Sequence, residues 1–186
     1  MTTAAPQEFT AAVVEKFGHE VTVKDIDLPK PGPNQALVKV LTSGICHTDL
    51  HALEGDWPVK PEPPFVPGHE GVGEVVELGP GEHDVKVGDI VGNAWLWSAC
   101  GTCEYCITGR ETQCNEAEYG GYTQNGSFGQ YMLVDTRYAA RIPDGVDYLE
   151  AAPILCAGVT VYKALKVSET RPGQFMVISG VGGLGH

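Results

Sequence analysis

The chain has 186 residues, and its 12 lysines and arginines against 24 aspartates and glutamates give a formal net charge of −12 at neutral pH. At ~150 residues per domain, this length predicts one domain with a core and at most the beginning of a second. The acidic balance argues against nucleic acid and anionic membrane surfaces as partners.

Two further features exclude other classes. The longest apolar run, residues 151–162, is shorter than a bilayer-spanning helix requires. The first residues lack the basic start and apolar core of a signal peptide. We therefore expect a cytoplasmic chain that contacts neither membrane nor nucleic acid.

Short stretches of alternating apolar and polar residues predict β-strands along most of the chain. Gly/Pro clusters, such as Pro29-Lys30-Pro31-Gly32-Pro33, separate these stretches and predict turns. The predicted strands are 10–17, 21–27, 36–42, 71–78 and 130–135. Helical spacing of apolar residues predicts a helix over 157–167, with a thiolate at its start favoured by the helix dipole. The pattern predicts a mainly β chain with some α, arranged as an antiparallel, barrel-like domain.

One candidate metal site consists of Cys46, His69 and Cys156. Each lies at the edge of an apolar segment beside Gly or Pro. Two sulfurs and one imidazole nitrogen leave the fourth position of a tetrahedral Zn²⁺ open for water or substrate, as in catalytic zinc sites. Spacing alone does not separate this reading from two buried thiols and a core histidine.

The other four cysteines lie close together and predict a different site. Cys100, Cys103, Cys106 and Cys114 fall within 15 residues, with gaps of two, two and seven residues. Two-residue gaps let successive thiolates point at one metal ion, and four sulfurs leave no open position, so the zinc would be structural. Disulfides or free thiols are the alternative, which the lack of an export signal disfavours.

The end of the chain changes character. The continuous apolar run 175–179 predicts a buried parallel strand, and Gly180-Val181-Gly182-Gly183-Leu184-Gly185 after it fits the dinucleotide-binding pattern GxGxxG. The helix, second strand and ribose-binding acid that complete such a site do not follow within the sequence. We therefore expect only the start of a truncated coenzyme domain.

The segments GICHTDLH, PGHEGVGEV, CGTCEYC, NGSFGQY and APILCAGVTVYKALK resemble the zinc-dependent medium-chain alcohol dehydrogenases, microbial tetrameric branch. The resemblance implies a GroES-like catalytic domain over 1–157, with helical content near 46–53 and after Cys156. It then implies a connecting helix and the start of a truncated NAD-binding Rossmann domain over 158–186. It implies two zinc ions per chain, the catalytic one held by Cys46, His69 and Cys156 and the structural one by the four-cysteine loop. It also implies NAD as coenzyme and a homotetramer for the full-length protein.

The same resemblance implies roles in proton transfer and coenzyme binding. The Thr48 hydroxyl would bond the substrate oxygen and start a proton relay that passes the coenzyme ribose and ends at His51, whose titration range suits that role. His47 would face the coenzyme pyrophosphate, and the other coenzyme residues would be Gly180, Gly182, Gly183, Leu184 and Gly185. The plainer alternative makes Thr48 a turn residue and His51 a surface histidine.

Two carboxylates and two indoles complete the set that the resemblance implies. Asp49 would accept a hydrogen bond from the free nitrogen of His69, and Glu70 would reach the zinc when water or product exchanges. Both could equally be solvated loop charges. Trp57 and Trp95 would narrow the pocket to ethanol-sized alcohols, although a packing role is the alternative for Trp57.

Two functions from different classes therefore remain. The first is a zinc-dependent alcohol dehydrogenase that oxidises small primary alcohols to aldehydes by hydride transfer to NAD, and the reverse, with zinc acting as a Lewis acid. The second is a zinc-stabilised GroES-like module without turnover in isolation. The complete set of ligand and relay residues favours the first, and the missing coenzyme domain favours the second.

Overall fold

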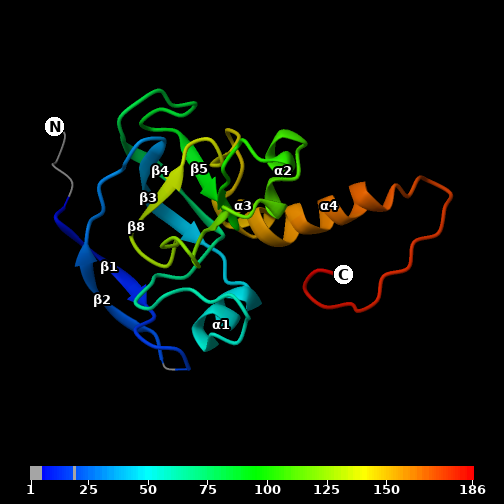
Figure 1. Cartoon of the computed structure of the whole chain (residues 1–186), viewed down its shortest axis with the longest axis horizontal. Coiled ribbons are helices and arrows are strands. Elements are labelled where there is room, and N and C mark those ends of the chain that lie inside the picture. Colours follow the sequence, from blue (N-terminus) through cyan, green and yellow to red (C-terminus); the bar gives the residue numbers. More distant parts are fainter. Residues whose placement is uncertain (1–5, 19) are drawn as a thin grey trace.

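A computed structural model describes residues 6–18 and 20–186 (Figure 1). The first five residues, on which part of the signal-peptide expectation rests, lie outside the described residues. The centre of the fold is a 5-stranded antiparallel sheet with strand order β8-β3-β4-β5-β9. Its strands are Gln35–Ser43 (β3), Gly71–Leu78 (β4), Ile90–Asn93 (β5), Tyr131–Asp135 (β8) and Ala140–Arg141 (β9). The prediction of a mainly β chain with some helix is confirmed.

Two smaller sheets flank the central one. The first pairs β1 (Glu8–Val13) with β2 (Thr22–Asp27), and the second pairs β6 (Leu96–Ser98) with β7 (Glu118–Tyr119). The strand predicted over 10–17 ends earlier, because Val14 makes only an isolated bridge to Phe65 and the chain then turns away.

One apolar cluster of the core is formed by side chains from the strands of the central sheet. Val38, Val75 and Val91 are fully buried and belong to one apolar cluster, to which Met132 on β8 also contributes. Leu155 packs with Val72 in a second apolar cluster. A Cβ on Gly92 would lie 2.7 Å from Leu155, so glycine at this point of β5 permits the close approach. This packing fixes the position of the residue that follows, Cys156.

Short helical segments occur between the strands. They are α1 (His47–Glu54), α2 (Glu104–Ile107), a 3-10 turn η1 (Glu111–Gln113), α3 (Tyr148–Pro153), a π-helical turn η2 (Ile154–Gly158) and α4 (Val159–Ser168). The last three form one continuous helical segment, which begins where the Asp147 side chain accepts a 2.8 Å hydrogen bond from the Leu149 backbone.

Two predictions concern this helical segment: the position of the Cys156 thiolate and a domain boundary. Cys156 lies in the π-helical turn inside the segment, so the expectation that its thiolate sits at a helix N-terminus is wrong. The helix starts earlier because Asp147 caps it, and Pro153 is accommodated within it. The predicted boundary between residues 157 and 158 falls inside this segment and stays a prediction.

The same segment, Tyr148–Ser168, is long and apolar enough to cross a membrane by its 21 residues and mean hydropathy of 1.2. A mostly buried core helix of a soluble protein passes the same test, and 17% of the apolar window of this helix is buried. The uninterrupted apolar run within it, residues 151–162, is shorter than a bilayer-spanning helix requires. That the chain contacts no membrane stays a prediction.

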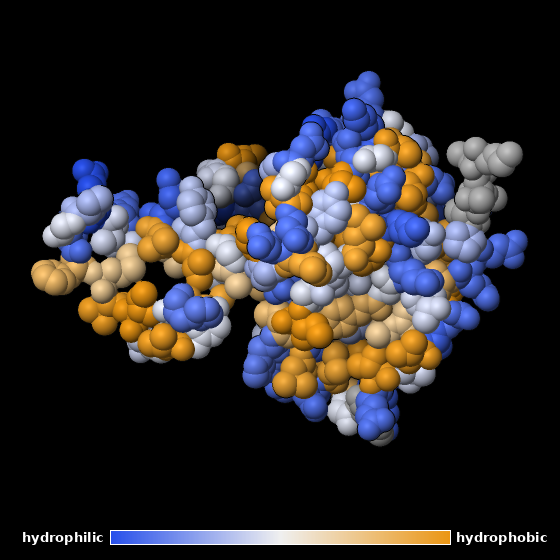
Figure 2. Space-filling model, turned by 180° about the vertical axis from the view of Figure 1, so that it is seen from behind, coloured by the Kyte–Doolittle hydropathy of each residue, from blue (hydrophilic) through white to orange (hydrophobic). Residues whose placement is uncertain are grey.

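Beyond α4 the chain continues without regular structure, and Figure 1 shows it turning back at a distance from the sheet. Phe175 and Val177 are almost fully exposed, and Figure 2 shows hydrophobic side chains uncovered on this projecting part. The strand predicted over 175–179 is not formed here. A strand forms when a neighbour pairs its N–H and C=O groups, and no described segment lies beside this one in a sheet.

Candidate metal centres

The first cluster joins residues from three distant parts of the chain. Ligand atoms of Cys46, His69, Glu70 and Cys156 all lie within 4.8 Å of one another. The Cys46 and Cys156 sulfurs are 3.8 Å apart, and His69 Nε2 lies 3.4 Å from the Cys156 sulfur. Two thiols, an imidazole and a carboxylate around one point are a donor set that fits Zn²⁺.

Asp49 connects the segments that carry Cys46 and His69 through hydrogen bonds. One carboxylate oxygen lies 3.2 Å from His69 Nδ1 and accepts a 3.1 Å bond from the Gly68 N–H. The other accepts a 2.9 Å bond from the Cys46 N–H. Because an ionised carboxylate only accepts, Nδ1 of His69 carries the proton and Nε2 faces the cysteines.

The surroundings shift the ionisation of the ligands. Burial lowers the pKa of His69, but Asp49 and Cys156 outweigh burial and raise it to about 10. Burial raises the pKa of the Cys46 thiol, yet hydrogen bonds from the Thr48 backbone and hydroxyl, from His69 and from Cys156 lower it overall. The cluster thus favours a negative sulfur beside a nitrogen that must lose a proton to bind a metal ion.

Glu70 lies next to His69 in sequence and points into the same cluster. It is 4% exposed, and burial raises the pKa of its carboxyl. A Cβ on Gly44 would lie 1.9 Å from Glu70 Oε2, so only glycine leaves room for this carboxylate. The carboxylate thus lies within 4.8 Å of the other three ligand atoms, and its role at a metal ion stays a prediction.

An aromatic wall stands beside the cluster, formed by Trp57, Trp95, Tyr119 and Tyr122. Trp95 meets His69 edge-on with ring centroids 5.3 Å apart, and it meets Trp57 in the same way at 6.0 Å. Tyr119 stacks on Trp95 at 4.9 Å, and Tyr122 contacts both indoles. The structure therefore places Trp95 beside a predicted metal ligand and Trp57 against Trp95, and their pocket roles stay predictions.

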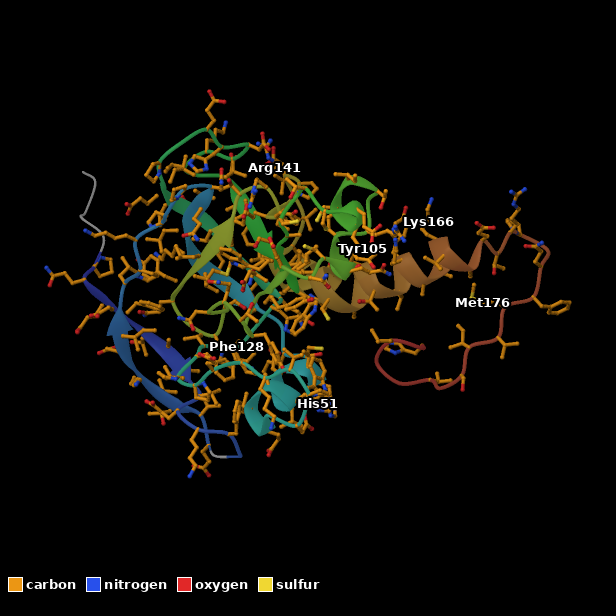
Figure 3. All side chains as sticks on the ribbon, in the orientation of Figure 1. His51, Tyr105, Phe128, Arg141, Lys166 and Met176 are labelled. Atoms are coloured by element: carbon orange, nitrogen blue, oxygen red, sulfur yellow. The ribbon has the colours of Figure 1, made fainter. Side chains whose placement is uncertain are left out.

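Three predicted relay or coenzyme residues lie on α1, on which Figure 3 labels His51. Thr48 is half-buried against the Cys46 thiol, whereas His47 is exposed with its ring 4.9 Å from that of His51. His51 stacks on Trp57 at 5.3 Å, and its Nδ1 lies 2.9 Å from Asp56 Oδ2.

The glycine turn predicted to bind coenzyme is not brought to this site. Its residues are mainly exposed, and the Gly182 carbonyl accepts hydrogen bonds from the N–H groups of Gly185 and His186. Those residues are Gly180, Gly182, Gly183, Leu184 and Gly185.

The second cluster contains the four neighbouring cysteines, whose sulfurs all lie within 4.8 Å of one another. All are free thiols. Backbone N–H groups of Thr102 and Cys103 lower the pKa of the Cys100 thiol to about 6, whereas burial raises that of Cys106 to about 12. Four converging sulfurs without a further ligand fit a closed tetrahedral zinc site.

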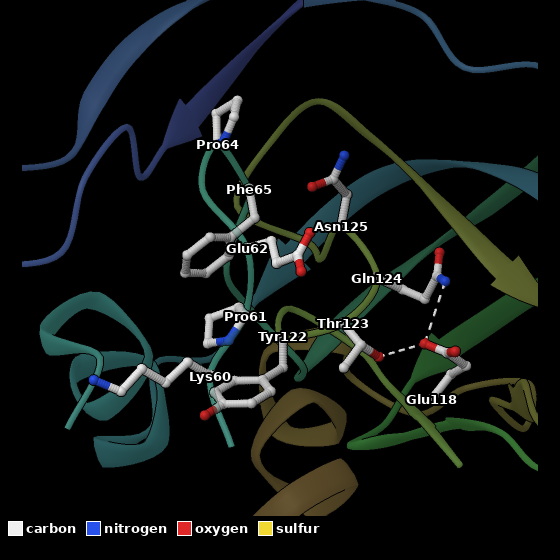
Figure 4. Close-up of a pocket in the computed structure, with 10 residues that line it drawn as sticks. All are labelled: Lys60, Pro61, Glu62, Pro64, Phe65, Glu118, Tyr122, Thr123, Gln124 and Asn125. Atoms are coloured by element: carbon white, nitrogen blue, oxygen red, sulfur yellow. Dashed lines mark hydrogen bonds between the residues drawn. The ribbon is translucent and has the colours of Figure 1, made fainter. Parts of the chain in front are cut away.

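A cavity of about 460 Å³ lies beside Tyr122 and contains none of the residues of either cluster (Figure 4). Phe65 and two prolines give it apolar surface, and Glu118, which accepts bonds from Thr123 and Gln124, gives it polar surface. Two carboxylates, those of Glu62 and Glu118, line the cavity, but it belongs to neither predicted site.

Sequence reasoning missed Asp56, Tyr119 and Tyr122. Asp56 directly precedes Trp57, and the Gly-Asp-Trp sequence after a predicted helix was the available signal. The two tyrosines lie in a glycine-rich stretch where no periodic pattern marks a buried face. Trp97, for which no role was predicted, is buried and donates to the Leu133 carbonyl at 3.1 Å.

The chain resembles known proteins along nearly its whole length. The alcohol dehydrogenase GroES-like domain matches residues 32–144. An alcohol dehydrogenase from Moraxella sp. (strain TAE123) is 56% identical over 95% of this chain and 52% of its own length. The chain thus spans about half the length of the curated relatives it matches.

Solved structures agree with this similarity. A thermostable alcohol dehydrogenase from Pyrobaculum aerophilum, described with cobalt and zinc bound, is 29% identical with a TM-score of 0.81 over 89% of this chain and 50% of its own. An acetophenone reductase from Geotrichum candidum in complex with NAD is 31% identical with a TM-score of 0.81, over 91% and 50%. With a GroES-like domain matched over most of its length and close relatives of one name, this chain belongs to the zinc-binding medium-chain alcohol dehydrogenase family.

Proposed function

We propose that this chain supplies the zinc-binding and alcohol-binding part of an NAD-dependent alcohol dehydrogenase that interconverts small primary alcohols and aldehydes. The observation that carries the proposal is the convergence of Cys46, His69 and Cys156 beside the aromatic wall. With these three residues as ligands, and Glu70 reaching the metal only when water or product exchanges, one coordination position is open for a substrate oxygen, which a closed four-sulfur site does not offer.

The two clusters would bind zinc ions with different roles. Cys46, His69 and Cys156 would hold the catalytic zinc, and the four-cysteine cluster the structural one. When bound at the first cluster, zinc supplies a Lewis acid of the kind that lowers the pKa of an oxygen ligand by many units. The metal-bound relative from Pyrobaculum aerophilum supports this assignment.

The residues of this chain prepare that site and handle the proton. Asp49 holds the proton on Nδ1 of His69, so that Nε2 is directed at the metal position. The Thr48 hydroxyl lies at the Cys46 sulfur, where it can bond a substrate oxygen. His51, partly exposed on the same helix, would pass the proton to solvent.

The aromatic wall accounts for the proposed preference for small alcohols. Trp95 lies against His69 and Trp57 against Trp95, in space that a branched substrate would need. An apolar pocket discriminates by steric exclusion at about 1–3 kcal/mol per methylene, which is a 10- to 200-fold preference. NAD is proposed as coenzyme because a structural relative carries it.

The test is zinc-dependent NADH formation with ethanol, propan-2-ol and a branched alcohol, measured on the zinc-loaded protein with NAD and NADP in parallel. We expect ethanol with NAD to give the highest kcat/KM in a form that includes a coenzyme domain. The matched variant is Trp95→Ala, which should raise the relative rate with the branched alcohol. A chain that binds two zinc ions but supports no turnover in any such form would contradict the proposal.

A further inference from the structure

We infer that Asp56 is a positioning residue for His51: its carboxylate holds the proton on Nδ1 and so makes Nε2 the nitrogen that exchanges protons. The inference rests on the proposed function for the role of His51 in proton transfer. The contact between Asp56 and His51 does not depend on that function. Both oxygens of Asp56 face His51 Nδ1, at 2.9 and 3.2 Å.

The direction of this hydrogen bond follows from the chemistry of the pair. An ionised carboxylate has no proton to donate, so Nδ1 of His51 is the donor. The neutral imidazole then has its lone pair on Nε2. A residue at the outer end of a proton relay needs one defined basic nitrogen, and Asp56 supplies that definition.

The backbone is arranged to bring Asp56 to this place. Gly55 ends α1 in the left-handed region at φ 62°, and its N–H donates to the His51 carbonyl at 2.9 Å. A Cβ on Gly55 would lie 2.6 Å from the Phe17 ring, so glycine is required both for the turn and for the packing. The turn returns the chain over the last turn of the helix, where the next two residues meet His51.

The second of these residues fixes the imidazole plane. Trp57 stacks on His51 with 28° between the rings, and the indole is itself held by Trp95 and Tyr122. His47 is the other titratable group against the His51 ring. Burial raises the pKa of Tyr122, and the Asp56 charge raises it further.

The experiment reads the tautomer of His51 directly and requires no coenzyme or turnover. Long-range ¹⁵N–¹H correlation spectra of the zinc-loaded chain, at a pH where the imidazole is neutral, distinguish a proton on Nδ1 from one on Nε2. We expect Nδ1–H in the wild type, and loss of that pattern in favour of Nε2–H in Asp56→Ala. Asp56→Asn keeps an acceptor oxygen and should retain the Nδ1–H pattern.

Glu54→Ala is the matched control, because it removes an exposed carboxylate from the same turn of the helix without a bond to His51. The inference is overturned if Asp56→Ala leaves the wild-type pattern, or if Glu54→Ala changes it equally. A negative result here leaves the alcohol dehydrogenase proposal standing. Loss of turnover with an intact Nδ1–H pattern would instead count against the function alone.

Discussion

At the scale of single residues, one buried carboxylate connects the parts of the first cluster. Asp49 is 3% exposed and accepts hydrogen bonds from the His69 imidazole and from the Cys46 backbone. A ligand held in this way has one orientation before the metal binds and keeps the proton on Nδ1 when Nε2 loses its own, so less order has to be imposed on binding.

Asp49→Asn should therefore weaken zinc binding at this cluster by about 10- to 100-fold, the usual effect of losing a partner of a metal-ligating histidine. Competition with a chromophoric chelator measures this affinity. Asp144→Asn is the control, because Asp144 is exposed and away from both clusters. Equal zinc affinity in Asp49→Asn and the wild type would contradict the positioning role.

The raised pKa of His69 predicts a pH dependence of zinc binding. Below its value of about 10, a proton occupies the imidazole and competes with the metal ion for Nε2. Each pH unit lost below that value reduces the deprotonated fraction about tenfold, so zinc affinity at this cluster falls as pH falls. Chelator competition at about pH 8 and about pH 6 measures the slope, and a pH-independent affinity would contradict it.

At the scale of secondary-structure elements, the sequence predicted those features that a local residue pattern specifies. Alternation located the five longest strands, and two-residue gaps located the four-cysteine cluster. Strands of two to four residues, such as β5 and β9, were missed because they are too short to show a period. The start of the long helix at Tyr148 was missed too, because the Asp147 cap and the internal Pro153 lie outside the apolar pattern that was read.

The site depended more on tertiary structure. Cys46, His69 and Cys156 could be grouped only through a family resemblance, since their approach requires the packing of Leu155 against β4 and β5. The tyrosines of the aromatic wall carry no local signal either. The strand predicted over 175–179 fits the sequence but has no strand beside it among the described residues.

The four-cysteine cluster should stabilise its loop through the metal. Among the described residues, Ala99, Ala117 and Tyr138 pack with these cysteines, and metal ligation can supply ~10–16 kcal/mol in such a loop. Cys103→Ser should remove one zinc ion and lower the Tm by more than about 5 °C, since ~1 kcal/mol corresponds to about 2–4 °C at this chain length.

Differential scanning calorimetry with zinc analysis checks this prediction. Cys156→Ser is the comparison, because it removes a ligand of the other cluster and leaves the four-cysteine loop intact. An unchanged Tm in Cys103→Ser would show that the loop does not depend on its metal.

At the scale of the whole molecule, one β domain contains two clusters of unlike chemistry. One has four sulfurs and is closed, and the other combines sulfur, nitrogen and a carboxylate beside an aromatic wall. The chain covers about half the length of its curated relatives, and apolar side chains along α4 and after it are exposed. The two metal sites can therefore be tested by experiments on this chain alone.

Zinc content per chain tests that account most directly. After dialysis against zinc and removal of excess, elemental analysis of the purified chain should give two zinc ions per chain in the wild type. Cys46→Ser and Cys103→Ser should each retain one zinc ion, the remaining ion being at the cluster that was not altered. One zinc ion per wild-type chain, unchanged by Cys46→Ser, would contradict the assignment of Cys46, His69 and Cys156 as a metal site.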